Sequence, residues 1–388
     1  MSAFARALLI RPQAPEKDVR KSIKPIVFHH KIKSSGYAIQ NTPKLHGKIL
    51  KKGTFHAENK PSVTDGSLDS CDWGLMPRNV IVTDVQVIDL KKPEVVLTVN
   101  SDFSIVAANF MKCKTRSFHK HCNRIRAVAL SHSPVIQDSR LLVSVADDNK
   151  ALLWSTNSLE PLVEIPTSFE SNADASFIGQ DKAFVVASKN VLDIFGFSVN
   201  EKADDLLRYT PKSKVQKYGT LRENQLVGHS IERLVCDRQS LEGRLLAACS
   251  SRKVLLWDLV HEQVAAVAHD AFKIGVSSLV MPTPYEHTFA VSARDNSVTI
   301  VDDRTMHSVR DFTGCGFSLA SGAANRMSFT DNQLLLPSEC GSVYVFDIRE
   351  NKLLFKETFG KGAVTAVASN KSGFITASEN RIHYRTKE

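Results

Sequence analysis

The chain has 388 residues, of which 43% are hydrophobic and 23% charged, with a formal net charge of +9. This composition is that of a globular protein and excludes a chain that is disordered throughout. The charge is uneven, because residues 1–60 contain 13 Lys and Arg against 3 Asp and Glu. The rest of the chain is therefore close to neutral, and the positive charge belongs to an N-terminal arm.

Membrane and secreted classes are also disfavoured. No apolar run approaches the ~20 residues that a membrane-spanning helix needs, and the long apolar stretch of a secretory signal is missing. The seven cysteines form no C-x-x-C pair, which indicates a reducing intracellular compartment. The acid-free first residues are faintly similar to a mitochondrial presequence, although Pro12 and Pro15 limit an amphipathic helix there.

Residues 1–66 form the first segment of the chain. They are basic, contain five prolines and have few periodic apolar stretches. We expect a basic, partly disordered N-terminal extension.

From Ser67 onward the pattern becomes all-β. Apolar runs of four to seven residues alternate with polar turns, and helical periodicity over ten or more residues is missing. A strand, a polar turn and a second strand that ends in a bulky residue recur along the chain. The copies are Leu141–Trp154, Lys182–Phe195, Leu245–Trp257, Thr288–Val301, Leu334–Phe346 and Phe374–Tyr384, with a looser one at Val95–Val106.

The spacing of these copies is that of a repeat protein. Four of the five distances between their closing bulky residues are close to the period of about 40–45 residues of a four-stranded propeller blade. Gly228-His229 is followed 29 residues later by Trp257-Asp258. In these dipeptides the chain resembles the WD40-repeat β-propeller family. The likeness covers about residues 70–388, but Arg252 stands near a turn where the family usually has Asp.

The resemblance implies a seven-bladed β-propeller over residues 67–388, with an insertion near 199–223. The expected blades are approximately 72–119, 120–167, 168–229, 230–273, 274–315, 316–361 and 362–388. The last segment is too short for four strands, and a propeller closes its ring to avoid exposed edges. We therefore expect part of residues 48–75, a strand within Lys48–Leu75, to complete the last blade.

Histidines and tryptophans are interpreted as structural. His121, His229 and His269 precede the expected first strands of three blades. The resemblance implies that such a His forms a hydrogen bond within its own blade and braces it against the closing Trp, here Trp154 or Trp257. Cys113, His119, His121 and Cys122 also suggest zinc, but their spacing does not form two separated ligand pairs. We expect no metal and no cofactor.

Catalytic motifs are missing. The chain contains no phosphate-binding glycine loop, no H-E-x-x-H and no G-x-S-x-G. Adjacent acidic pairs such as Asp147-Asp148 are expected to cap turns, because neighbouring side chains on a strand point to opposite faces. We expect no enzyme and no small-molecule substrate; a propeller enzyme is the least favoured alternative, because fold does not decide function.

Clustered Lys and Arg are the candidate polyanion- or partner-binding residues. They lie in the arm, around 111–126 and within 208–222, and the same residues could instead be a solvated surface without a specific ligand. The candidates are Arg20, Lys21, Lys24, Lys48, Lys51, Lys52, Lys112, Lys114, Arg116, Lys212, Lys214 and Lys217.

These features predict a non-enzymatic WD-repeat scaffold that mediates protein–protein interactions in a multiprotein complex. The alternative is an RNA-associated component of a nuclear ribonucleoprotein or ribosome-assembly particle, since phosphate contacts need clustered cations. Binding to an anionic membrane surface is less favoured, because no amphipathic helix accompanies the basic residues. A nuclear location is favoured over a cytoplasmic one by the weak import-like cluster Lys48–Lys52.

Overall fold

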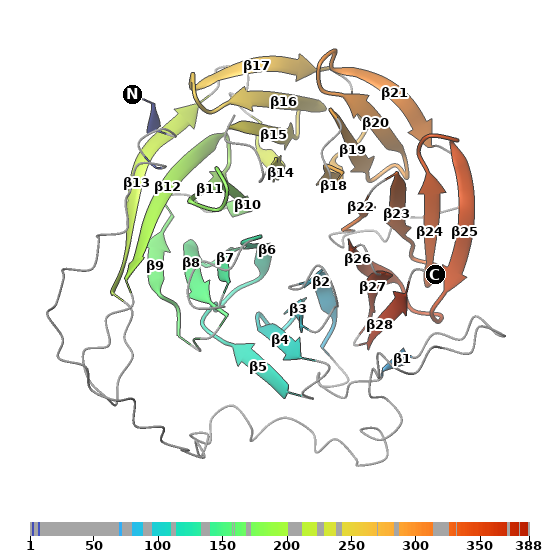
Figure 1. Cartoon of the computed structure of the whole chain (residues 1–388), viewed down its shortest axis with the longest axis horizontal. Helices are drawn as coiled ribbons and strands as arrows, with labels where there is room; N and C mark the ends of the chain where they lie inside the picture. Colours follow the sequence, from blue (N-terminus) through green and yellow to red (C-terminus); the bar gives the residue numbers. More distant parts are fainter. Residues whose placement is uncertain are drawn as a thin grey trace, which may run out of the picture.

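A computed structural model describes only part of the chain. The described residues are 2, 3, 7, 70, 71, 80–87, 95–109, 114–132, 140–156, 158, 160–167, 172–200, 212–222, 229–237, 243–269, 271–282, 287–312, 326–330, 332–370, 373–379 and 381–386. These residues form a seven-bladed β-propeller, and the predicted fold is confirmed (Figure 1). Each blade is a four-stranded antiparallel sheet.

The strands of the first four blades run outward from the channel in chain order. Blade 1 contains β2 (Val82–Val87), β3 (Val95–Asn100), β4 (Ile105–Asn109) and β5 (Lys114–Phe118). Blade 2 contains β6 (Ile125–Leu130), β7 (Leu141–Ala146), β8 (Lys150–Ser155) and β9 (Val163–Pro166). Blade 3 contains β10 (Asn172–Ile178), β11 (Ala183–Ser188), β12 (Val191–Asn200) and β13 (Lys212–Arg222). Blade 4 contains β14 (Ile231–Cys236), β15 (Arg244–Cys249), β16 (Lys253–Asp258) and β17 (Gln263–Ala268).

The remaining blades follow the same order, except that the last one takes its outer strand from the start of the fold. Blade 5 contains β18 (Val276–Val280), β19 (Thr288–Ala293), β20 (Val298–Asp302) and β21 (His307–Phe312). Blade 6 contains β22 (Ser328–Thr330), β23 (Gln333–Pro337), β24 (Ser342–Asp347) and β25 (Lys352–Thr358). Blade 7 contains β26 (Val364–Asn370), β27 (Gly373–Ser378), β28 (Arg381–Thr386) and β1 (Ser70–Cys71).

Ring closure is made by β1, which lies inside the segment Lys48–Leu75 where a closing strand is expected. Ser70 pairs with His383 and Cys71 with Ile382. The described strands of each blade fall within the blade boundaries expected from the repeat, apart from this closing strand.

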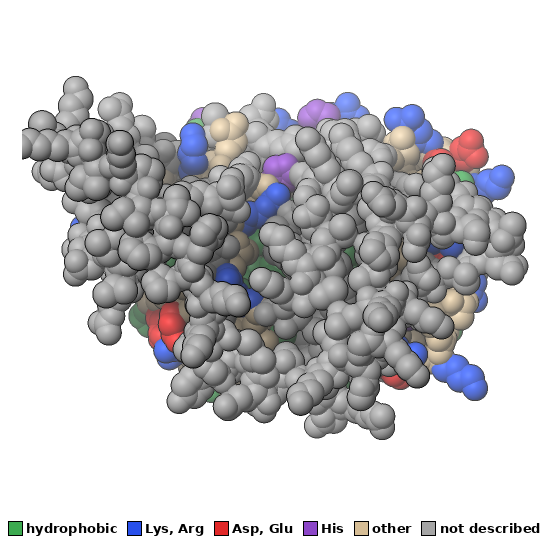
Figure 2. All heavy atoms as spheres, turned by 60° about the horizontal axis from the view of Figure 1, so that its bottom comes forward, with side chains coloured by type: hydrophobic (Ala, Val, Ile, Leu, Met, Phe, Trp, Pro, Cys, Tyr) green, Lys and Arg blue, Asp and Glu red, His purple; other side chains and the backbone are tan. Residues whose placement is uncertain are grey.

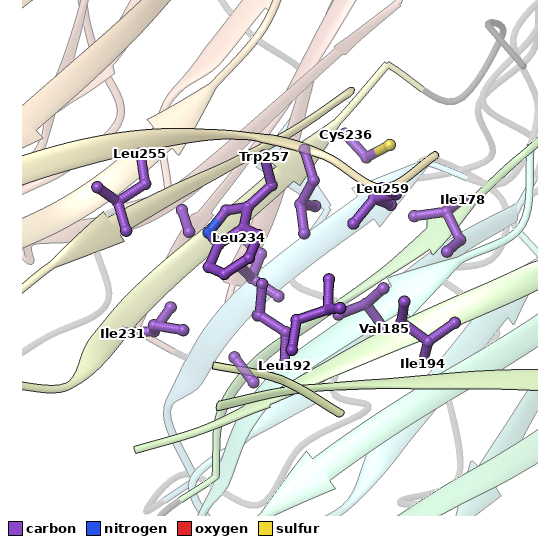
Figure 3. Close-up of a cluster of buried hydrophobic side chains, with 14 of the residues drawn as sticks. Ile178, Val185, Leu192, Ile194, Ile231, Leu234, Cys236, Leu255, Trp257 and Leu259 are labelled. Atoms are coloured by element: carbon purple, nitrogen blue, oxygen red, sulfur yellow. The ribbon is translucent and has the colours of Figure 1, made fainter. Parts of the chain in front are cut away.

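Apolar packing lies mainly between neighbouring blades. The second and third strands of a blade are covered on both faces, so β7, β11 and β27 are buried along their full length. This explains why they read as continuous apolar runs rather than as alternating ones. Figure 3 shows one such cluster, in which Leu192 and Ile194 of blade 3 meet Leu234 and Trp257 of blade 4.

The predicted insertion near 199–223 is largely part of a blade. Lys212–Arg222 is β13, the outer strand of blade 3, and it pairs with β12 over ten residue pairs. The extra length of this repeat therefore comes from a long hairpin. Residues 201–211 at its tip lie outside the described part.

Two residues of the N-terminal segment also contact the propeller. Ala3 and Ala7 have helical backbone, are buried, and join the apolar cluster between blades 3 and 4. The Ala3 N–H donates to a carboxylate oxygen of Glu262. A Cβ on Gly219 would lie 2.6 Å from the Cβ of Ala3, so glycine permits this close approach. Most of the basic arm lies outside the described residues.

Candidate functional site

Blade 2 contains a complete hydrogen-bond network around Trp154. The buried indole Nε1 donates to Ser144 Oγ at 2.9 Å, and Ser144 Oγ lies 2.7 Å from His121 Nε2. His121 Nδ1 lies 2.8 Å from Asp148 Oδ2. The indole can only donate, so Ser144 Oγ accepts from Trp154, and the Ser144 hydroxyl can donate to Nε2 in the tautomer whose Nδ1–H faces Asp148. Burial lowers the pKa of His121 although Asp148 acts to raise it, and a lowered pKa favours the neutral ring.

Blade 4 contains the GH and WD dipeptides but no such network among its described residues. Trp257 is buried among aliphatic side chains (Figure 3), and its Nε1 has no hydrogen-bond partner. His229 is exposed, as is His269 before blade 5. Asp258 instead orders the turn after β16, where Oδ1 accepts the N–H groups of Val260 and His261.

The bracing predicted from the resemblance is thus present at His121 and Trp154. It is not present at His229 and Trp257. Blade 4 lacks the hydroxyl and carboxylate that link the two rings in blade 2, and His229 lies two residues before Ile231, whereas His121 lies four residues before the corresponding Ile125. Both ring nitrogens of His121 are engaged, so it is not available to a metal. Among the described residues no group of potential ligands could hold a metal ion, and Cys113 lies outside them.

The first strand of six blades has a β-bulge near its first residues. β2, β6, β10, β14, β18 and β26 each shift register there, and such bulges redirect side chains. The shifts fall at Val82/Asp84, Ile125/Ala127, Asn172/Asp174, Ile231/Arg233, Val276/Ser278 and Val364/Ala366. These strands line the centre of the ring in Figure 1, so polar residues at the bulges meet there.

Four charged residues from four blades form a channel cluster: Asp84, Asp174, Arg233 and Arg326. Arg326 Nε lies 3.5 Å from Asp84 Oδ2, and its Nη1 lies 3.7 Å from Asp174 Oδ2. Arg233 Nε donates to the Ser277 carbonyl oxygen at 3.0 Å. The sequence analysis missed this cluster, because its members lie far apart in the chain and none belongs to a motif.

Burial and the opposite charges compete in setting the pKa values of the channel cluster. Burial raises the pKa of Asp84, and Arg326 offsets only part of this effect. Burial lowers the pKa of Arg233 to about 10, with repulsion from Arg326 contributing. For Arg326 the two carboxylates outweigh burial, so its pKa is raised. The charges compensate one another, and the cluster joins blades 1, 3, 4 and 6 across the channel.

The predicted basic residues are only partly described. Arg20, Lys21, Lys24, Lys48, Lys51, Lys52 and Lys112 lie outside the described residues, and only the backbone of Lys114 and Lys212 is described, in β5 and β13. Arg116 donates to the Thr156 carbonyl oxygen at 2.6 Å, and Lys217 pairs with Asp193 at 2.8 Å. Lys214 is exposed. Two of these cations therefore have intramolecular partners.

An apolar patch lies on the outer rim of blade 6. Leu353, Leu354 and Phe355 of β25 are 39%, 40% and 40% exposed, and β25 is the free edge of its sheet. Leu354 is the extra residue of a bulge, so Leu353 and Phe355 point to opposite faces of the strand. Lys352 and Lys356 flank the patch and are also exposed. We call Leu353, Leu354 and Phe355 the β25 patch.

No protein-family model matches the chain. In the described part, no helix combines the length and hydropathy needed to cross a lipid bilayer. The fold is a β-propeller of repeated blades, a fold that commonly serves as a platform for protein interactions.

Proposed function

We propose that this protein is a non-enzymatic scaffold that mediates protein–protein interactions in a multiprotein complex. The observation that carries the proposal is the β25 patch, three consecutive apolar residues on the edge strand of a rigid blade. Exposed apolar edge strands favour pairing with another chain. The charged groups in the channel support a structural role, because they are paired with one another or with the backbone rather than directed at a substrate.

The RNA-associated alternative depends on the basic segments. Arg116 and Lys217 already bind groups of the propeller, which favours the scaffold over this alternative. The nuclear location stays a prediction.

The test compares the assembly state of two double variants in extracts of cells that produce the protein. Leu354→Glu with Phe355→Glu places charge on two of the three residues of the β25 patch, and Ile81→Glu with Val260→Glu makes the same charge change at other exposed apolar positions. We expect the wild type and the second variant to elute from a sizing column as a larger assembly. The first variant should elute at the mass of a single chain. A wild-type protein that elutes alone, or equal loss in both variants, would contradict the proposal.

A further inference from the structure

One end of the propeller is built from two kinds of segment in each blade. The first strand begins there, and the turn between the second and third strands lies beside it. Backbone hydrogen bonds join the two segments, for example from Asp147 N to Arg124 O and from Arg294 N to Ile274 O. We call this end the His121 face, because His121 lies on it.

Charge on the His121 face is distributed unevenly. Blades 3 to 5 contribute six cations that are exposed or half-buried: Lys189, Arg222, Arg252, Lys253, Lys273 and Arg294. The other blades contribute both signs to this face: the exposed acids Asp102, Glu339 and Glu379 in blades 1, 6 and 7, and the exposed cations Lys361 and Arg381 in blade 7 and Arg124 in blade 2. In blade 2, Lys120 and Lys150 pair with Glu164, and Arg126 pairs with Asp147. Blades 3 to 5 differ in having the six cations without a described exposed acid at their turns. We call the six cations the basic sector.

The two acids described within the basic sector are occupied by the backbone. Glu232 accepts the N–H of Val276 at 2.8 Å, and Asp295 accepts the N–H of Ser297 at 3.1 Å. Glu223 and Asp270 fall outside the described residues. The six cations against these two acids leave a formal net charge of +4 among the described residues of this sector.

The basic sector is held on a continuous backbone. Ile231 N donates to the Lys189 carbonyl oxygen across the boundary of blades 3 and 4, and Arg233 Nε reaches Ser277 across the boundary of blades 4 and 5. A Cβ on Gly275 would lie 3.3 Å from the Arg294 side chain, so Arg294 packs against bare backbone. The fold of blades 3 to 5 thus positions the cations of the basic sector.

An apolar side chain lies within this sector. Ile274 is 60% exposed, the largest fraction among the exposed large hydrophobic residues described. Its neighbour Lys273 is exposed, while Phe272 is buried in the core. Single-stranded nucleic acid would be favoured by exposed aromatic rings, on which bases stack. An exposed aliphatic residue with cations around it fits an acidic peptide that carries an apolar side chain.

We propose that the basic sector, with Ile274, binds an acidic segment of a partner protein that carries an apolar residue. This inference extends the proposed scaffold function to a surface separate from the β25 patch. The cations supply attraction to the carboxylates, and Ile274 supplies an apolar contact that selects among acidic chains.

The test uses three labelled probes in fluorescence anisotropy at low salt, where screening is weak. They are a ten-residue Glu/Ser peptide with one central Leu, the same peptide with Ser in place of Leu, and a ten-residue uridine RNA. Arg252→Glu with Lys273→Glu should weaken binding of the Leu peptide by about tenfold or more. Lys182→Glu with Lys352→Glu makes the same charge change away from the His121 face, and it should change the affinity for the Leu peptide by less than about twofold. Ile274→Ser should weaken binding of the Leu peptide only.

Three results would overturn the inference: no binding of the Leu peptide by wild type, equal loss in both charge variants, or tighter binding of the RNA. The double variant Leu354→Glu with Phe355→Glu distinguishes this inference from the scaffold function. If that variant elutes as a single chain while the Leu peptide fails to bind the wild type, peptide binding by the basic sector is excluded and the scaffold function stands.

Discussion

Blades 2 and 4 place a buried Trp at the same position but support it differently. Trp154 pairs with Leu142 and Trp257 with Leu245, so Ser144 corresponds to Ala247. In the following turns Asn149 and Arg252 both have positive φ, 61° and 63°, so Asp148 corresponds to Ser251. Blade 2 therefore has a hydroxyl and a carboxylate where blade 4 has a methyl group and a hydroxyl.

The consequence is visible in the polar atoms of blade 4. Trp257 Nε1 and Ser251 Oγ are buried without a described hydrogen-bond partner, whereas the corresponding atoms of blade 2 are paired. The dipeptides most typical of the resemblance thus occur in the blade without the network. Trp257 is held by apolar packing, and among the described residues a Trp-centred network of this kind occurs in blade 2 alone.

Of the changes that test the difference between blades 2 and 4, removing the central hydroxyl of blade 2 should change the free energy of unfolding most. Ser144→Ala leaves both Trp154 Nε1 and His121 Nε2 buried without a partner, and we expect a loss of ~2–4 kcal/mol in the free energy of unfolding. Urea unfolding followed by tryptophan fluorescence measures it. A loss below about 1 kcal/mol would mean that blade 2, like blade 4, depends on packing alone.

Acidification should lower the free energy of unfolding through blade 2 and not through blade 4, by less than the Ser144→Ala change. Because burial lowers the pKa of His121, the unfolded chain takes up the proton first as the pH falls. The contribution of His121 to stability is complete above about pH 6.5 and declines below it, by at most about 1.4 kcal/mol per pH unit.

Urea unfolding at about pH 7.5 and about pH 5.5 tests this, where wild type should lose more stability on acidification than His121→Gln. His229→Gln is the matched control in blade 4 and should retain the wild-type pH dependence, since His229 is exposed. Equal pH dependence in wild type and His121→Gln would contradict the prediction.

Adding the missing hydroxyl to blade 4 should change the free energy of unfolding least. Ala247→Ser places an acceptor where Ser144 stands in blade 2, and we expect the free energy of unfolding to rise by up to about 1 kcal/mol. The midpoint of urea unfolding measures the gain. A destabilisation comparable to that of Ser144→Ala would show that Ala247 is required by packing and that the two positions are not equivalent.

Local patterns were enough to predict the blades. Each blade depends on short apolar strands and polar turns that are close in sequence, so the all-β class and the repeat follow from the order of residues, while the number of blades followed from the resemblance. The need to close the ring predicted a strand within Lys48–Leu75, and Ser70–Cys71 lies near the end of that segment. The same reasoning treated Lys212–Arg222 as an insertion, because a long basic outer strand has no apolar pattern that distinguishes it from a loop.

The sequence by itself thus determined the architecture and the excess of charge in the arm. Only the tertiary structure decided which His supports which Trp, since this depends on a hydroxyl and a carboxylate from two other segments of the blade. It also decided that Asp84 and Arg326 meet in the channel and that cations of blades 3 to 5 share one face. The physical reason is that ring closure brings residues from distant repeats together, and no periodicity along the chain records those contacts.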